Sequence, residues 1–361
     1  MPSVAIELPH HRYEVSIEPG CLDRLGDIVR AKAPHGACSL FSDGAIADSL
    51  GARATASLER AGYRVTRAEL EPGEEHKTLD TVRGLYDRFL DARLERGSPA
   101  IALGGGVTGD TVGFAAATYL RGVPFVQCPT TLLAMVDSSV GGKVGVNVPQ
   151  GKNLIGAFHQ PVAVVIDPLV LASLPMRELR CGLAECIKHG AIRDAGLLAF
   201  LDRERASLLA LDPATLTELV RWNVAIKAAV VMADEKETGE RAHLNFGHTF
   251  AHAIEATVGY GALLHGEAVG LGMIAAAELA RRIGLCSDEV PSVLRSQVGA
   301  VGLPTSAVLP DDERLLGAMK LDKKVSGSRL RFILPVGLGS VVIRDDVGAD
   351  DVAAAWSMVR A

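Results

Sequence analysis

The sequence is poor in aromatic residues and has no cluster of basic residues. Aromatic side chains account for 4% of the 361 positions, and no run of Lys and Arg is longer than two. Nucleic-acid binding relies on a basic surface stripe, often with aromatic side chains that stack on bases. The formal net charge of −6 is also spread along the chain. We therefore expect no nucleic-acid partner.

The sequence also has no long hydrophobic segment. No stretch of about 18 uncharged apolar residues is present, so no membrane-spanning helix is expected. The first residues, MPSVAIELPHHRYE, do not combine a basic start with an apolar core, as a secretory leader does. These features predict a soluble, cytoplasmic protein that does not contact a membrane.

The six cysteines contain no C-x-x-C pair. In a chain of this length without a secretory leader, they are expected to be reduced thiols, mostly buried. A structural zinc site built from cysteine is therefore not expected.

The distribution of apolar residues divides the chain into two parts. Up to Pro175, short apolar runs alternate with amphipathic helices, which is typical of a parallel sheet. Strands are expected at 37–41, 63–70, 99–103, 125–128 and 163–166, with an antiparallel pair at 4–8 and 13–17. From Met176 to about Gly302 successive helices follow, and two strand-like runs return at 330–334 and 340–343. The sequence predicts an α/β protein: a parallel-sheet domain, 1–175, followed by an all-helical or mainly helical domain, 176–361.

A glycine-rich loop follows the strand expected at 99–103 and opens a helix. It reads GGGVTGD, Gly104 to Asp110. Glycines allow backbone N–H groups to close around an anion, and the helix N-terminus adds partial positive charge. The pattern is neither G-x-G-x-x-G nor a Walker loop. It favours a nucleotide or phosphate site over a plain tight turn.

Polar residues gather near this loop in two further segments. The tip at 72–77 follows a strand, where open α/β sheets bind ligands, although a solvated turn is equally consistent. Farther on, Lys143, Lys152 and Asn153 come close together in the sequence, after an apolar helix that polar residues such as Asp137 interrupt. An anionic substrate and a solvated surface are equally good explanations.

The segment from Arg241 to Glu267 carries four of the ten histidines. His248 and His252 are four residues apart on an apolar-periodic helix, so they should share one face, and His265 follows after a glycine break. No H-E-x-x-H is present. By spacing alone, a metal group and separate local hydrogen bonds are equally plausible. A metal site would still need another ligand, usually a carboxylate, and Glu185 on an apolar helix either pairs with its neighbours or serves as that ligand.

Together these stretches closely resemble the 3-dehydroquinate synthase family of sugar-phosphate cyclases. The resemblance runs from about 43 to 324 and includes GGGVTGD, RGVPFVQCPTTLLAMVDSSVGGK, GKNLIGAFHQP, LRCGLAECIKHG, LNFGHTFAHAIE and LHGEA in that order. It implies a homodimer with a Rossmann-like N-terminal domain, a helical C-terminal domain, bound NAD and one divalent metal, zinc or cobalt. The reaction it implies converts 3-deoxy-D-arabino-heptulosonate 7-phosphate into 3-dehydroquinate and phosphate, by transient oxidation, phosphate elimination, re-reduction and aldol closure.

The resemblance also implies roles for individual residues. The metal ligands are Glu185, His248 and His265. The NAD contacts are Asp43, Glu74, Lys77, Gly106, Thr108, Gly109, Asp110, Thr130 and Thr131, with Lys143 and Lys152 also near the cofactor. The residues that act on the substrate are Lys143, Lys152, Asn153, Lys188, Lys227, Arg241, Asn245, His252 and one of Lys323 or Lys324. Arg121 would reach in from the partner subunit.

Three other functions remain open from the sequence. A related cyclase acting on a heptulose 7-phosphate or on glucose 6-phosphate would use the same fold, although the combination of Arg241, Lys227 and the lysines at 323–324 favours a substrate that carries a carboxylate. A metal-dependent alcohol or glycerol dehydrogenase would accumulate NADH with its substrate. A non-catalytic nucleotide-binding protein would need no metal and would not depend on Glu185.

Overall fold

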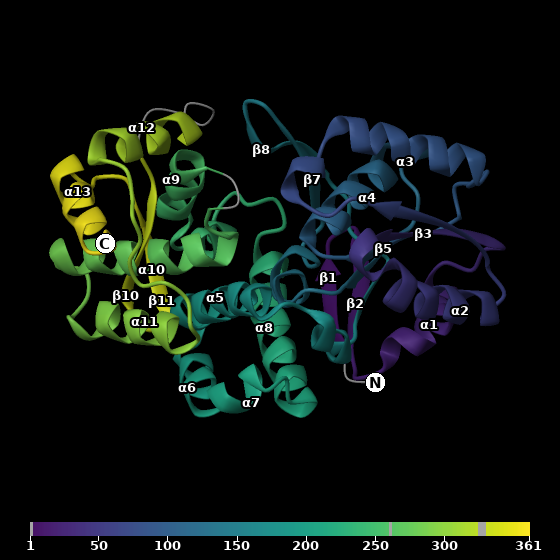
Figure 1. Ribbon diagram of the computed structural model, residues 1–361, viewed down its shortest axis with the longest axis horizontal. Coiled ribbons are helices and arrows are strands. Elements are labelled where there is room, and N and C mark those ends of the chain that lie inside the picture. Colours follow the sequence, from purple (N-terminus) through teal and green to yellow (C-terminus); the bar gives the residue numbers. More distant parts are fainter. Residues whose placement is uncertain (1–2, 260–261, 324–329) are drawn as a thin grey trace. The chain divides into compact units, whose positions relative to one another are not determined.

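The computed structural model describes residues 3–259, 262–323 and 330–361, without the side chains of 321–323. The chain forms two compact units, which are Met1–Pro175 with Leu216–Lys236, and Met176–Thr215 with Glu237–Ala361. Figure 1 shows the strands of the first unit in purple, blue and teal and the helices of the second in teal, green and yellow.

The first unit is built on a seven-stranded sheet in the order β1-β2-β9-β6-β5-β3-β4. β1 and β2 pair antiparallel, and the other neighbouring strands of this sheet pair parallel. Every strand that the apolar runs predict here is present. The strands are β1 (Ser3–Leu8), β2 (His11–Ile17), β3 (Ala37–Asp43), β4 (Arg64–Leu70), β5 (Ala100–Gly104), β6 (Phe125–Pro129) and β9 (Ala163–Ile166).

The central strands of this sheet are fully buried. All residues of β5, β6 and β9 are buried, which explains why these strands are continuous apolar runs without alternation. Phe41, Phe89 and Phe125 belong to one hydrophobic cluster with residues of α3 and α4. The helices between the strands are α1 (Leu25–Lys32), α2 (Ala52–Arg60), α3 (Leu79–Asp91) and α4 (Gly106–Thr118).

The strand order reverses between β3 and β5. From β3 the chain first adds β4 on one side and then returns to place β5 on the other. In open α/β sheets, ligands bind at the carboxyl ends of the strands at such a switch point. Asp43 ends β3 and the glycine loop follows β5, so both lie at this point.

A short helix and then a β-hairpin follow β6. The interrupted apolar helix that the sequence suggested is a short one, with a π-helical part at Ala134–Ser138. After it, β7 (Lys143–Val148) pairs antiparallel with β8 (Gly151–Phe158). Gly141 and Gly142 have positive φ, which ends the helix before β7. The alternation of Val144, Val146 and Val148 is a period-two signal that the sequence did contain.

The second unit is mainly helical, with one hairpin. Its helices are α5 (Met176–Arg193), α6 (Ala195–Arg203), α7 (Arg205–Leu209), α9 (His248–Val258), α10 (His265–Arg282), α11 (Glu289–Ala300), α12 (Asp312–Lys323) and α13 (Ala349–Ser357). The strand-like runs near the C-terminus form the antiparallel pair β10 (Phe332–Gly337) and β11 (Ser340–Arg344), so this unit is not all-helical. The helix α8 (Pro213–Ala233) contributes residues from Leu216 onward to the first unit.

Helix α10 forms the centre of the second unit. Every residue from Gly266 to Ala280 is buried, as expected of a helix that is apolar on all sides. Phe250 on α9 packs against Phe332 of β10 and Trp356 of α13, with ring centroids 5.7 and 4.8 Å apart. This packing holds α9, the helix that begins with His248, against β10 and α13.

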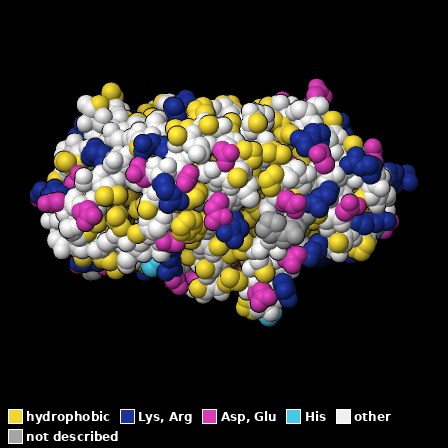
Figure 2. Space-filling model, turned by 90° about the horizontal axis from the view of Figure 1, so that it is seen from below, with side chains coloured by type: hydrophobic (Ala, Val, Ile, Leu, Met, Phe, Trp, Pro, Cys, Tyr) yellow, Lys and Arg dark blue, Asp and Glu magenta, His cyan; other side chains and the backbone are white. Residues whose placement is uncertain are grey.

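One face of the molecule carries charges of both signs, and the described helices can be examined for a membrane span. On the face drawn in Figure 2, Lys and Arg side chains are interspersed with Asp and Glu. Among the helices that the structure describes, none is both long and apolar enough to cross a bilayer.

Candidate active site

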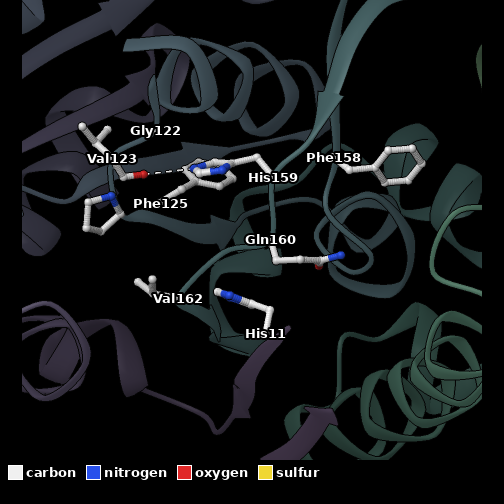
Figure 3. A pocket seen from close by; sticks show the side chains of 9 residues that line it. His11, Gly122, Val123, Phe125, Phe158, His159, Gln160 and Val162 are labelled. Carbon is white, nitrogen blue, oxygen red and sulfur yellow. Dashed lines mark hydrogen bonds between the residues drawn. The ribbon is translucent and has the colours of Figure 1, made fainter. Parts of the chain in front are cut away.

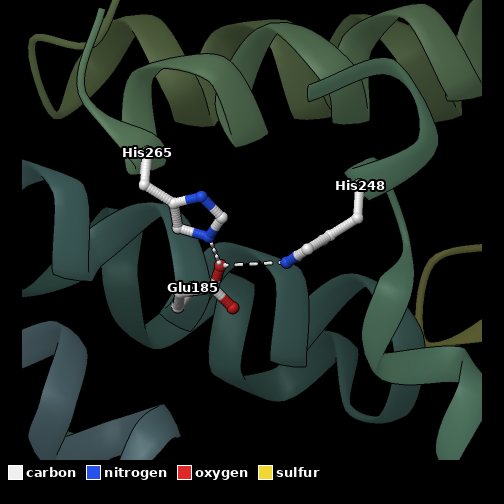
Figure 4. A group of neighbouring side chains, drawn as sticks. All are labelled: Glu185, His248 and His265. Atoms are coloured by element: carbon white, nitrogen blue, oxygen red, sulfur yellow. Dashed lines mark ion pairs between the residues drawn. The ribbon is translucent and has the colours of Figure 1, made fainter. Parts of the chain in front are cut away.

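The three predicted metal ligands meet within the second unit. Glu185 lies in the middle of α5, and His248 and His265 are the first residues of α9 and α10. One ligand atom from each lies within 4.8 Å of the others. The Nε2 atoms of His248 and His265 are 3.8 and 3.7 Å from Glu185 Oε1 (Figure 4). A tetrahedral zinc ion binds its ligand atoms at about 2.0–2.2 Å, which places the ligand atoms about 3.3–3.6 Å from one another. The distances from Glu185 Oε1 to the two histidine nitrogens are close to this range, so the three residues can hold a zinc ion.

Glycines bring the three helices close enough for this arrangement. A Cβ atom on Gly266 would lie 2.3 Å from Cys181 Cα, and one on Gly272 would lie 2.2 Å from Gly247 O. The first contact joins α10 to α5, and the second joins α10 to the start of α9. Any larger residue at Gly266 or Gly272 would push the ligand-bearing helices apart.

His248 has the protonation state that a metal ligand needs. Burial, followed by the positive charge of Lys188 and the neighbouring imidazoles of His265 and His252, holds the pKa of His248 well below its usual value. Its Nδ1 lies 3.1 Å from the carbonyl oxygen of Phe246, which can only accept, so Nδ1 carries the proton. Nε2, which faces Glu185, then offers its lone pair.

Glu185 is a fully buried carboxylate with a cation beside it. Its side chain is 0% exposed, and Lys188, one helical turn away, is 1% exposed and forms an ion pair with it. A buried carboxylate is costly unless it is paired or binds a metal. The two alternatives that the sequence left for Glu185, pairing and ligation, are therefore both compatible with its surroundings.

Three predicted substrate residues also lie in the second unit, one of them beside this group. His252 lies beside it, with its ring centroid 5.6 Å from that of His248. Arg241 and Asn245 belong to the short 3-10 helix Glu240–Asn245. Arg241 is buried, and Asn245 donates a hydrogen bond to Glu237 at 2.8 Å.

The glycine loop of the first unit has the construction of an anion cradle. Gly105 is the N-cap of α4, so the backbone N–H groups from Gly106 onward point out of the helix start. A Cβ atom on Gly104 would lie 2.5 Å from Thr108 Oγ1, and one on Gly109 would lie 2.5 Å from Gln127 Oε1. Glycine is thus needed at these positions for two reasons. A side chain would overlap neighbouring side chains, and it would keep an anion away from the backbone N–H groups.

A hydrogen-bond network ties the polar tip to this loop. Lys77 Nζ donates to Asp110 Oδ2 and to Asn153 Oδ1, each at 2.6 Å. Burial raises the pKa of Asp110, and the ammonium group of Lys77 opposes that shift. Asn147 donates to Glu74 Oε1 at 2.8 Å and accepts from the Asn153 N–H at 2.9 Å. Asn147 was missed in the sequence because the hairpin that presents it was not predicted.

A buried lysine also contacts the segment before the hairpin. Lys227, on α8, is buried and donates to the backbone oxygen of Asp137 and, at 2.6 Å, to its Oδ1. This contact lies within the first unit. Lys143 is exposed at the start of β7.

The predicted site residues divide between the two units. The first unit contains Asp43, Glu74, Lys77, Gly106, Thr108, Gly109, Asp110, Arg121, Thr130, Thr131, Lys143, Lys152, Asn153 and Lys227, and the second contains Glu185, Lys188, Arg241, Asn245, His248, His252 and His265. Lys323 ends α12, but its side chain and the whole of Lys324 lie outside the described residues. All of these roles remain predictions.

A shallow pocket of the first unit lies apart from the cradle. It has a volume of about 440 Å³, and its lining includes His11, Gly122, Phe158, His159 and Gln160 (Figure 3). The ring of His159 is held by a hydrogen bond to the carbonyl oxygen of Val123 at 3.0 Å. None of the predicted site residues lines this pocket.

Comparison with known proteins identifies relatives along the whole chain. Residues 67–181 match the family model of the 3-dehydroquinate synthase N-terminal domain, and residues 182–325 match that of the C-terminal domain. The 3-dehydroquinate synthase of Nostoc punctiforme is 47% identical over 352 residues, which cover 96% of each chain.

Two solved structures have the same fold over nearly the whole chain. The 2-epi-5-epi-valiolone synthase of Streptomyces hygroscopicus, solved with NAD⁺ and Zn²⁺ bound, is 29% identical with a TM-score of 0.90 and 98% of each chain covered. A 2-deoxy-scyllo-inosose synthase, complexed with carbaglucose-6-phosphate, NAD⁺ and Co²⁺, is 27% identical with a TM-score of 0.87, covering 96% of this chain and 95% of that one. From its sequence and its fold, the chain belongs to the 3-dehydroquinate synthase family.

Proposed function

We propose that this protein converts 3-deoxy-D-arabino-heptulosonate 7-phosphate into 3-dehydroquinate and phosphate, with NAD and one divalent metal ion as cofactors. The observation that carries the proposal is the 47% identity to a 3-dehydroquinate synthase over 96% of the chain. The clustering of Glu185, His248 and His265 supports it, since their donor atoms suit zinc.

Each cofactor has a plausible set of residues. The metal would be held by Glu185, His248 and His265, and zinc or cobalt there would act as a Lewis acid on a substrate hydroxyl. NAD would be held by the glycine loop and the residues around the β3–β5 switch point, and it would accept and return one hydride, so that the net redox change is zero. The helix N-terminus at Gly106 supports the placement of the pyrophosphate.

The cationic side chains suit a substrate with two anionic ends. Lys143, Lys152, Lys188, Lys227 and Arg241 would hold the phosphate and the carboxylate, with Asn153 as an amide donor and one of Lys323 or Lys324 as a further cation. Fixed donors at both ends align the reacting carbon atoms between them and lower the entropic part of the barrier. Among these side chains, Lys188, Lys227 and Arg241 are buried, so each contributes a charge that little water screens.

Proton transfer would involve the substrate's own phosphate together with His252 and Asn245. We infer that His252 and Asn245 position the phosphate and relay a proton through water, with no separate strong base. The position of the His252 ring supports this role, because it lies beside His248, while the clustered ligand atoms belong to Glu185, His248 and His265.

We also propose that the protein is a cytoplasmic homodimer in which Arg121 of each subunit reaches the partner's site. Each subunit would consist of two domains, 1–175 and 176–361. Leu120, Arg121 and Gly122 all have positive φ, of 49°, 67° and 117°. Such a backbone is strained for Leu and Arg, and strain of this kind is concentrated at functional positions. On β8, Leu154 and Phe158 are 50% and 48% exposed, which gives an apolar surface suited to a subunit contact.

The proposal is tested by measuring phosphate release from the heptulosonate phosphate, a heptulose 7-phosphate and glucose 6-phosphate, while NADH absorbance is followed in parallel. We expect release from the heptulosonate phosphate alone, at catalytic NAD⁺ and without accumulation of NADH. A chelator should abolish the activity, and zinc should restore it.

Three outcomes would contradict the proposal. Full activity after removal of metal would exclude the metal scheme. Accumulation of NADH without phosphate release would instead identify a dehydrogenase. Preferential release from one of the other two sugar phosphates would identify a related cyclase.

A further inference from the structure

We propose that Glu255 is a positioning residue that orients the His265 ring and thereby sets the affinity of the site for zinc. The inference rests on the proposed metal site and adds to it a residue outside the three predicted ligands. Glu255 lies on α9, the helix that begins with His248, and faces the start of α10.

Glu255 and Glu185 contact opposite nitrogens of the same ring. His265 Nδ1 lies 3.2 Å from Glu255 Oε1, and His265 Nε2 lies 3.7 Å from Glu185 Oε1. A carboxylate only accepts hydrogen bonds, so Nδ1 carries the proton and Nε2 has a lone pair directed toward Glu185. Glu255 therefore selects the tautomer that a metal ligand needs.

The same division of roles is present at His248. Its Nδ1 donates to the carbonyl oxygen of Phe246, and its Nε2 faces Glu185. Metal-binding histidines characteristically donate their second N–H to a carbonyl or a carboxylate, which fixes the ring and raises its basicity. The two histidines thus have equivalent support, one from the backbone and one from a side chain.

His265 depends on this support more than the other two residues. Its side chain is 33% exposed, against 12% for His248 and 0% for Glu185. Packing alone therefore restrains the His265 ring least. The Glu255 side chain is only 9% exposed, so its carboxylate is held in place and can restrain the ring.

The position of Glu255 follows from the helix geometry. It comes seven residues after His248, or about two turns, so α9 presents both side chains on one face. Close contact between Gly247 and Gly272 brings that face against α10. The carboxylate also lies near the N-terminus of α10, where negative charge is favoured.

The test is the zinc affinity of the full-length, metal-stripped protein, measured by competition with a chromogenic chelator. We compare the parent with Glu255→Leu, which removes the acceptor, and Glu255→Gln, which keeps an acceptor oxygen. Loss of such outer contacts weakens metal binding about 10- to 100-fold. We expect that loss for Glu255→Leu and an intermediate affinity for Glu255→Gln.

The control is Thr257→Val, which removes the hydroxyl group that bonds to the Ala253 carbonyl on the same helix. We expect this variant to bind zinc as the parent does, and the thermal midpoints of the metal-free variants to match. The inference would be overturned if Glu255→Leu bound zinc as tightly as the parent. It would also be overturned if Glu255→Gln bound zinc no more tightly than Glu255→Leu, or if Thr257→Val lost as much zinc affinity as Glu255→Leu. Failure of the parent itself to bind zinc would count against the proposed function instead.

Discussion

At the level of single residues, the site is defined by which charges are buried and which have partners. Glu185 and Lys188 are both almost fully inaccessible and form an ion pair, whereas His248 is kept neutral by its surroundings. A cationic metal would be stabilised by the carboxylate and would not meet a protonated imidazole at neutral pH. The chemistry of each ligand therefore depends on its environment and not on its residue type alone.

The two neighbouring histidines of α9 should differ in their effect on metal binding. In His248→Asn, loss of a ligand should weaken zinc binding by more than about 100-fold. Removal of only a hydrogen-bond partner of a ligand already weakens metal affinity about 10- to 100-fold. In His252→Asn, zinc affinity should stay near the parental value while kcat/KM falls about 100-fold or more, as for a residue that assists proton transfer. Zinc titration and steady-state kinetics on both variants check this, and equal metal loss in both would show that His252 is also a ligand.

At the level of secondary structure elements, glycines determine how closely the helices of the second unit approach one another. Gly266 allows α10 to cross α5 at Cys181, and Gly272 allows it to cross α9 at Gly247. A histidine at the first position of each helix can then face Glu185. The local sequence of α10 indicates a buried helix, but nothing in it identifies the residues against which it packs.

Substitution of Gly266 should therefore disturb both stability and metal binding. In Gly266→Ala the new Cβ would overlap Cys181 Cα and O, at 2.3 and 2.4 Å, and overpacking of this kind costs about 1–3 kcal/mol. Gly317→Ala in α12 is the matched control, because a Cβ there meets no atom within 4 Å, and it should stabilise by about 0.5–1 kcal/mol. Thermal unfolding and zinc titration measure both effects. A Gly266→Ala protein as stable as the control would contradict the tight helix crossing.

At the level of the whole molecule, the homodimer that we propose would build each active site from residues of two protomers. Arg121 occupies a strained turn of the first unit and is exposed. If it acts on the partner's site, each site combines residues from two copies of the chain, and neither copy is active alone. This arrangement can be tested by mixing two inactive variants.

Arg121→Gln and Glu185→Gln should each inactivate the protein, and a mixture should recover activity. After subunit exchange at equal amounts, about half of the dimers contain one copy of each variant. In each of these mixed dimers, one of the two sites has both Arg121 and Glu185 intact. Activity should therefore return to about a quarter of the parental value. Phosphate release before and after exchange is the measurement. If Arg121 served its own subunit, no dimer would contain an intact site, and the mixture would stay inactive.

Much of the fold was predictable because it depends on local patterns. The apolar runs at 99–103, 125–128 and 163–166 identified buried parallel strands, and GGGVTGD identified the loop after β5. The hairpin at 143–158 was not predicted, although Val144, Val146 and Val148 alternate, because the apolar segment before it suggested a helix. Likewise, the spacing of His248 and His252 indicated a shared face but could not distinguish a ligand from its neighbour.

By itself, the sequence determined most of the secondary structure elements, the glycine loop and the set of side chains able to bind a metal or an anion, because periodicity and residue type act over a few positions. Only the tertiary structure decided which of these side chains meet. Glu185 is 63 residues from His248 and 80 from His265 in the sequence, and their contact depends on the helix crossings at Gly266 and Gly272. The contact between Glu255 and His265 arises in the same way, since it forms only when α9 and α10 pack closely together.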